Sequence, residues 1–269
     1  MSSYHPPAGP PTRDGEARHN GHGHGSDGSH SYDSHDSTYE DWAARSRLVV
    51  TPIAAPSILG LFGFAGATFM VASNLAGWWG NALLSPVIIA PFAIFFGGLA
   101  QLLAGMWSYR ARDGVATAMH GTWGAFWLAW GMTALMAANG LLPPNVFTTQ
   151  AFGFWWIVLA VVTLFGALAA LAENMALFLV LILLASGSAL LATGLISPAS
   201  NLVTAAGWVL VASAAAAFYT AGAMMLKSAY RGRVILPLGE WSMRGNLPGH
   251  RAIRPISYPM GEPGTKVGQ

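Results

Sequence analysis

A few polar side chains interrupt long apolar stretches in this sequence, and these are the residues that could do chemistry. Gln101 stands in the middle of FFGGLAQLLAGMWSYRARDG, which begins as an almost wholly apolar run. Small and polar residues recur there at intervals of three or four, at Gly98, Gln101, Gly105 and Ser108. That spacing predicts a helix with one small, polar face and an apolar remainder.

Three polar residues in the apolar stretches each allow two interpretations. A buried amide is costly without a hydrogen bond, so Gln101 should face protein or water. It then either bonds another helix or offers its N–H groups to a carboxylate in a pore, and the two interpretations are equally supported. His120 is a packed imidazole, which is slightly favoured, or a protonatable pore residue. Asn74 caps the end of its helix or meets an entering anion.

The sequence contains no arrangement typical of an enzyme. Its apolar stretches hold no pair of Asp or Glu, no H-E-x-x-H zinc motif and no phosphate-binding loop, and His120 has no carboxylate partner in sequence reach. Cysteine is absent, which excludes disulfides and thiol chemistry. We therefore expect no catalytic residues, no cofactor, no metal site and no nucleic-acid partner, and we interpret the protein as a conduit.

The composition indicates that these stretches lie in a membrane. Only 9% of the residues are charged, against about a quarter in soluble domains. Between positions 48 and 225 the charged residues are Arg110, Arg112, Asp113 and Glu173. The apolar runs between them are long enough to span a bilayer. We predict an all-α integral membrane protein with six transmembrane helices, at about 54–76, 86–109, 115–138, 151–172, 174–196 and 201–226.

Basic residues predict the orientation. They flank the cytoplasmic ends of the predicted spans, at Arg45, Arg47, Arg110, Arg112, Lys227, Arg231 and Arg233. The loops after the first, third and fifth spans contain neither Lys nor Arg. The positive-inside rule therefore predicts a multi-pass protein of the plasma membrane with both termini in the cytoplasm.

Two tails flank the predicted membrane domain, 45–240. Residues 1–44 are rich in His, Gly and Ser and contain six of the eight histidines, without an apolar signal segment. We favour a disordered, solvated tail, with loose binding of a transition metal as the alternative. Residues 241–269 are basic and rich in Pro and Gly, which predicts a second disordered tail that is attracted to membrane lipid.

Depth in the membrane brings three bulky positions together. Phe64, Trp123 and the group Leu181 to Leu184 lie about 12–15 Å from the cytoplasmic end of the first, third and fifth spans at 1.5 Å per residue. Apolar side chains at one level can form a constriction that excludes water. Ordinary packing between helices or against lipid is the alternative on depth alone.

Four motifs, in order, give the sequence a family resemblance. They are APSILGLFGFA from Ala55, FGGLAQLLAG from Phe96, TWGAFW from Thr122 and RVILPLGE from Arg233. Together they resemble the signature segments of the acetate and succinate permease family, the acetate uptake transporters. The resemblance covers about residues 54–240.

The resemblance implies a fold, a function and a set of residues. It implies a six-helix channel or proton-linked permease for small carboxylates such as acetate, with a pore in each subunit of a homo-oligomeric ring, most simply a hexamer. It implies a constriction at Phe64, Trp123 and Leu183. The residues that we expect along the substrate path are Pro56, Ser57, Gly60, Leu61, Asn74, Gln101 and His120.

This chain departs from the family pattern at several motif positions. Ala55 and Ile58 replace the signature asparagine and its second proline, Trp123 replaces a tyrosine, and Ser108 stands where an acidic residue is common. Trp123 can only donate a hydrogen bond, through its indole N–H. Two rival functions stay open: a conduit for another small solute such as ammonia, and a metal-responsive receptor or scaffold that uses the histidine-rich tail.

Overall fold

The computed structural model describes residues 53–81 and 84–241, which all belong to one compact unit, residues 49–269. The predicted tails lie outside the described residues apart from Trp241, so the proposed boundaries at 44 and 240 stay predictions. Among the described residues the regular elements are helices, as expected for an all-α membrane protein.

Six long helical segments correspond to the six predicted spans, with ends that differ by a few residues. They are α2 (Pro56–Leu75), the continuous segment α3 (Ser85–Phe92), η1 (Ala93–Ala100) and α4 (Gln101–Ala111), then α5 (Gly114–Ala138), α6 (Gln150–Ala170), α7 (Met175–Ile196) and α8 (Ser200–Ala229). Five of them are long and apolar enough to cross a membrane. The sixth, α5, has 25 residues and is less apolar because it contains His120 and several Gly, Thr and Trp residues.

The second segment is not the regular helix that its apolar pattern predicts. Pro91 lies inside α3, where it has no N–H to donate and its ring crowds the carbonyl four residues earlier. The following eight residues, η1, form a π-helix, whose wider turns accommodate such an interruption. Gln101 is the first residue after the π-helix.

The small and polar stripe of this segment faces the protein, as predicted. All four of its members are buried, at Gly98, Gln101, Gly105 and Ser108. The other faces expose large apolar side chains, including those of Phe95, Leu99, Leu103 and Met106, as suits contact with lipid. Gly105 is needed for close packing, because a Cβ atom there would be 2.7 Å from the backbone nitrogen of Gly121 in α5.

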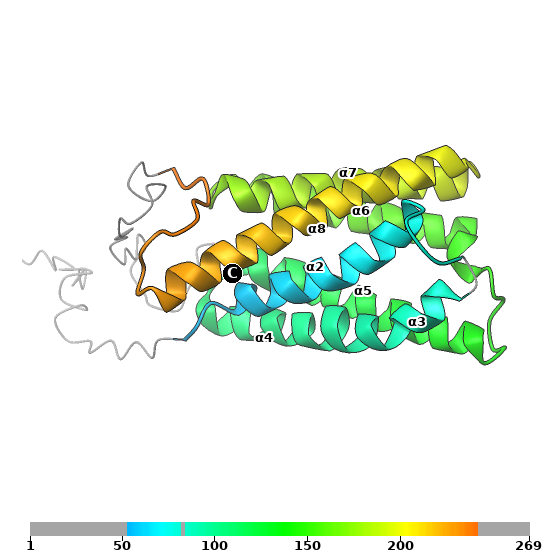
Figure 1. Cartoon of the computed structure of the whole chain (residues 1–269), viewed down its shortest axis with the longest axis horizontal. Coiled ribbons are helices and arrows are strands. Elements are labelled where there is room, and N and C mark those ends of the chain that lie inside the picture. The colour runs from blue at the N-terminus through cyan, green and yellow to red at the C-terminus, as the bar shows by residue number, and fades with distance from the viewer. Residues whose placement is uncertain (1–52, 82–83, 242–269) are drawn as a thin grey trace, which may run out of the picture. The chain divides into compact units, whose positions relative to one another are not determined.

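The long helices run side by side along one direction (Figure 1), and their contacts with one another form a closed ring. Going round it, α2 packs on α8, α8 on α7, and α7 on α6; on its other side α2 packs on η1 and α4, which pack on α5. The ring closes between α5 and α6, the sparsest of these contacts. Side chains that point to the middle of the ring therefore come from several helices.

N-cap residues fix the turns at one end of the helix bundle. The side chain of Asp113 accepts a hydrogen bond from the N–H of Ala116 at 2.8 Å and begins α5. Asn174 likewise accepts from the N–H of Leu177 at 2.9 Å and begins α7. Both are oxygen-bearing side chains at the N-cap position, the arrangement that satisfies unpaired helix donors.

The segment after α8 returns across the start of α7. The N–H groups of Met175 and Ala176 donate to the carbonyls of Gly239 and Leu238, at 3.1 and 2.9 Å. Lys227 forms an ion pair with Glu240 at 2.5 Å. The motif RVILPLGE thus completes the hydrogen bonding of the first turn of α7.

Candidate permeation site

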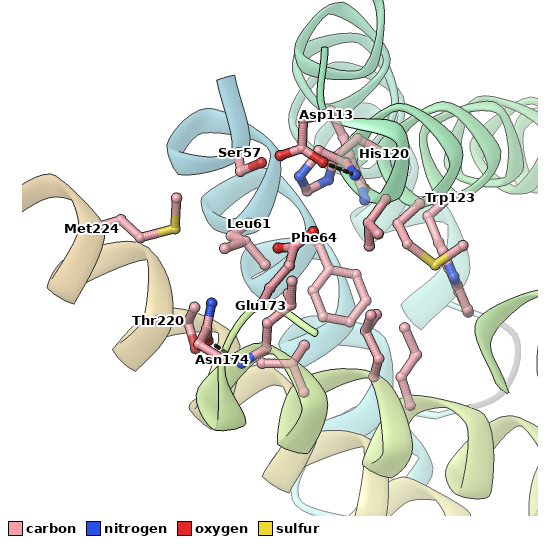
Figure 2. Close-up of a pocket in the computed structure, with 18 residues that line it drawn as sticks. Ser57, Leu61, Phe64, Asp113, His120, Trp123, Glu173, Asn174, Thr220 and Met224 are labelled. Atoms are coloured by element: carbon pink, nitrogen blue, oxygen red, sulfur yellow. Dashed lines mark hydrogen bonds between the residues drawn. The ribbon is translucent and has the colours of Figure 1, made fainter. Parts of the chain in front are cut away.

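A pocket lies inside the ring near the Asp113 and Asn174 caps (Figure 2), and we call it the His120 pocket. Its cavity volume is about 60 Å³, enough for a few water molecules. Residues of α2, α4, α5, α7 and α8 line it, among them Ser57, Leu61, Phe64, Gln101, His120 and Trp123. Six of the ten residues expected along the path or constriction are therefore gathered round one cavity.

Phe64 and Trp123 meet at the end of this pocket. Their ring centroids are 6.0 Å apart and their planes cross at 71°, an edge-to-face contact. Both side chains are buried, and Figure 2 shows Phe64 in the midst of the lining residues. The depth estimate from the sequence had placed them at one level, and they are in contact.

Leu183 is not part of this pocket. It is only partly buried, whereas Leu181 and Leu184 line the cavity and are buried. Consecutive residues of a helix are rotated by about 100° about its axis. Leu181 and Leu184, which are three residues apart, therefore share the inward face, and Leu183 points elsewhere. Of the group Leu181 to Leu184, Leu181 and Leu184 are the leucines that line this cavity, and the constriction itself stays a prediction.

Gln101 and His120 bring polar atoms to the pocket wall. They are 2% and 5% exposed, and Oε1 of Gln101 and Nδ1 of His120 have no hydrogen-bond partner among the described residues. A polar atom in such a place needs a partner from the cavity's contents to offset its burial. Gly60 does not line the cavity but packs under the imidazole of His120, and Pro56 begins α2 outside it.

The charges at this pocket are negative. Asp113 and Glu173 line it, whereas none of the described lining residues is Lys or Arg. Asp113 is partly neutralised because it caps α5. The sequence had not singled out these two residues, or Asn174 and Thr220, as lining residues. Their position in the sequence was the only sign of this role: three of them lie in turns between spans, and Thr220 brings a hydroxyl into an apolar helix.

A second pocket lies inside the same ring of helices, displaced from the first along the helix axes, and we call it the Asn74 pocket. Its cavity volume is about 460 Å³. Asn74 lines it and donates from Nδ2 to the carbonyl of Trp79 at 2.6 Å and to Oγ of Ser85 at 3.0 Å. Its amide therefore both holds the loop after α2 and borders the cavity.

Seven residues separate the two pockets on each of three helices. The last residues of the His120 pocket are Phe64, Trp123 and Leu184, and the first residues of the Asn74 pocket are Val71, Trp130 and Leu191. Seven residues are about two helical turns, so the members of each pair share a helix face about 10 Å apart. The pockets are therefore in line, with a barrier between them.

Aromatic rings and two hydroxyls fill the barrier. Phe126 contacts Trp123, at a centroid distance of 5.3 Å, and Trp156, at 5.2 Å. At the same level on α2 and α7, the buried Oγ1 of Thr68 and Oγ of Ser188 have no partner among the described residues. The barrier is mainly apolar, and these two hydroxyls are polar groups within it that are unpaired among the described residues.

Comparison with known proteins places this architecture. The family model described as the GPR1/FUN34/yaaH family matches residues 43–237. The succinate-acetate/proton symporter SatP of Escherichia coli is 31% identical over 191 residues, which cover 71% of this chain and 97% of SatP. Acetate permease A of Emericella nidulans is 29% identical over 213 residues, covering 71% and 68%. A solved structure of the bacterial acetate channel SatP superposes with a TM-score of 0.64 at 30% identity, covering 70% of this chain and all of that one.

Proposed function

The chain belongs to the GPR1/FUN34/yaaH family, and we propose that it is a channel or proton-linked transporter for acetate and related small carboxylates. The observation that carries this proposal is the alignment of the His120 and Asn74 pockets inside one ring of helices. A solute that leaves one pocket along the ring reaches the other after about 10 Å. Relatives named as acetate transporters make a carboxylate the solute of choice.

The constriction in this proposal consists of Phe64, Trp123 and the neighbouring leucines Leu181 and Leu184. Their buried, apolar side chains end the His120 pocket on three different helices. An apolar constriction of this kind excludes water and so raises the barrier for an ion. Gln101 and His120 hold the carboxyl group on the side of the constriction that faces the Asp113 and Asn174 caps.

The solute crosses as the neutral acid, or as the anion together with a proton. The described lining of the His120 pocket offers an acetate ion no basic side chain and places Asp113 and Glu173 near its mouth. A bare anion would lose its hydration there without a compensating charge. Because a lower pH raises the protonated fraction of the acid, flux should rise as the pH falls.

The surroundings of the conduit complete the proposal. The protein is a multi-pass membrane protein, and we place it in the plasma membrane with both termini in the cytoplasm, as the distribution of Lys and Arg indicates. The His120 pocket then opens on the cytoplasmic side. We further propose a homo-oligomeric ring, most simply a hexamer, in which every subunit contains its own pair of pockets.

Uptake of radiolabelled acetate into proteoliposomes tests the proposal. Flux is measured at several pH values, alone and in competition with formate, propionate, succinate and ammonium. We expect saturable acetate flux that grows toward low pH and that other small carboxylates inhibit. Uptake no greater than in protein-free vesicles, or inhibition by ammonium alone, would reject a carboxylate conduit. Native mass spectrometry in detergent tests the oligomer, and a monomer alone would contradict the ring.

A further inference from the structure

The contact between α5 and α6 is a narrow line of paired residues. A Cβ atom on Gly166 of α6 would collide with the side chain of Met119 of α5, which shows how closely that pair packs. One turn farther along, Trp123 faces Thr163, and beyond them Phe126 faces Trp156. This line is the sparsest junction of the ring and it passes through the constriction.

One hydrogen bond joins the two helices at the level of the constriction. Nε1 of Trp123 donates to Oγ1 of Thr163 at 3.0 Å. The two residues are 1% and 0% exposed, so solvent does not compete for this bond. By contrast, the indole N–H groups of Trp127 and Trp156 have no partner among the described residues. Of these three neighbouring indoles, Trp123 is the one held by a side-chain hydroxyl.

We propose that Thr163 is a positioning residue for the constriction, whose hydroxyl latches the indole of Trp123 against Phe64. Thr163 does not line either pocket, so it acts through Trp123 and not on the solute. The proposal rests on the proposed function, in which Trp123 narrows the conduit.

The latch determines which solutes pass. An indole offers one N–H and no acceptor, so Trp123 can have a single hydrogen-bond partner, which selects among the orientations that its packing allows. Without the Thr163 oxygen, the buried N–H loses that partner and the narrow arrangement loses its advantage over wider ones. Loss of one neutral hydrogen bond of ordinary net strength changes the ratio of the narrow to the wider arrangements by about 2–10-fold. Larger acids should gain most, since they need the wider arrangement.

Transport by matched threonine variants tests the latch. Thr163→Val and Thr163→Ala remove the acceptor, Thr163→Ser keeps it, and Thr193→Val is the control, because the hydroxyl of Thr193 bonds only the carbonyl of Ala189 in its own helix at 2.9 Å. We expect the ratio of succinate to acetate flux, per amount of folded protein, to rise about 2–10-fold in the first two. Thr163→Ser and Thr193→Val should keep the ratio of the unaltered protein.

A double-mutant cycle separates the latch from general packing. Phenylalanine has no N–H, so in the Trp123→Phe background Thr163→Val should change the flux ratio no further. An equal rise in both backgrounds would show a packing effect and overturn the latch. An unchanged ratio in folded Thr163→Val and Thr163→Ala would overturn it as well.

A measurement without any solute keeps the latch and the transport function distinguishable. The indole N–H of Trp123 is followed by ¹⁵N–¹H NMR in nanodiscs, with its resonance identified by loss in Trp123→Phe. We expect slow deuterium exchange in the unaltered protein and about 2–10-fold faster exchange in Thr163→Val, the change that corresponds to one neutral hydrogen bond. That result without acetate flux would leave the latch standing and reject the proposed function. Equal exchange rates would reject the latch whatever the flux.

Discussion

The imidazole of His120 occupies the space that a side chain on Gly60 would need, since a Cβ atom there would be 2.5 Å from Cε1 of the ring. The two residues belong to α5 and α2, so glycine at position 60 permits the close approach that brings His120 to the pocket wall. His120 cannot turn away from α2 without rearranging the buried side chains around it.

Gly60→Ala should therefore displace His120 and impair the conduit. Overpacking of this kind costs about 1–3 kcal/mol, and we expect at least fivefold less acetate flux in proteoliposomes. Gly222→Ala is the matched control, because a Cβ atom on Gly222 of α8 would meet nothing within 4 Å. Flux and folded yield in proteoliposomes check both variants. His120→Ala should restore the folded yield of the Gly60→Ala protein, because it removes the colliding ring, but not the flux, because His120 also holds the carboxyl group. A folded yield that stays low in the double variant would remove the collision as the cause.

Phe64→Ala should widen the constriction. We expect higher succinate uptake and a weaker preference for low pH, with a nearly unchanged amount of folded protein, because water then persists at the barrier. If Phe64 only packs, the cavity costs about 3–5 kcal/mol and lowers the folded yield without changing selectivity. Phe62→Ala serves as the control, since Phe62 contacts Phe218 and does not line the His120 pocket. Flux normalised to folded protein distinguishes the two results.

Gln101→Leu should reduce acetate flux by about 2–10-fold, the value of one net hydrogen bond. The variant keeps the volume and removes a buried amide whose Oε1 lacks a partner among the described residues, so the protein should remain as stable. Ser108→Ala on the same helix face is the control, because its hydroxyl donates to the carbonyl of Ala104 at 2.8 Å. Flux that is unaffected in Gln101→Leu, with normal stability, would leave Gln101 with a structural role alone.

Asp113→Asn should weaken the preference for low pH. Asparagine also caps helices, so α5 should begin unchanged while the pocket loses a negative charge. A partly screened charge is worth about 0.5–1 kcal/mol, which predicts about 2–5-fold more flux at neutral pH and little change at acidic pH. The ratio of acetate flux at the two pH values measures this. A ratio equal to that of the unaltered protein would show that Asp113 does not influence the permeating species.

Deletion of residues 1–44 should leave acetate flux and its pH dependence unchanged within twofold. The described residues that line the two pockets lie between positions 57 and 224, so we expect the conduit to work without the histidine-rich tail. Flux is compared with and without added zinc in both forms of the protein. Loss of function on deletion, or a zinc response that the deletion abolishes, would favour the metal-responsive receptor instead.

The sequence predicted the helices well because a bilayer imposes a simple rule. Each span needs about twenty apolar residues, and the breaks contain Pro, Gly or charge, so the ends differ by only a few residues. The inward face of the second segment was also predictable, since Gln101 and Ser108 could not face lipid. The π-helix η1 was not, because an apolar pattern does not report which backbone groups are paired.

The sequence allowed the depth of the pocket's side chains to be predicted, but not which side chains contact one another. Phe64 and Trp123 meet because residues at equal depth in adjacent spans can touch. Leu181 and Leu184 line the cavity and Leu183 does not, which shows the limit of a depth estimate, since one residue changes the helix face by 100°. Thr163 was visible as a lone hydroxyl in an apolar run, but its bond to Trp123 depends on how α5 and α6 are rotated.

The return of residues 238 and 239 to the start of α7 has a consequence for biogenesis. The N–H groups of Met175 and Ala176 find their carbonyl partners more than sixty residues later in the chain. While the ribosome is still producing α8, those partners do not yet exist outside it, and the first turn of α7 stays open to water. The α6–α7 turn, which contributes Glu173 and Asn174 to the lining of the His120 pocket, is therefore completed only after residue 239 has left the ribosome.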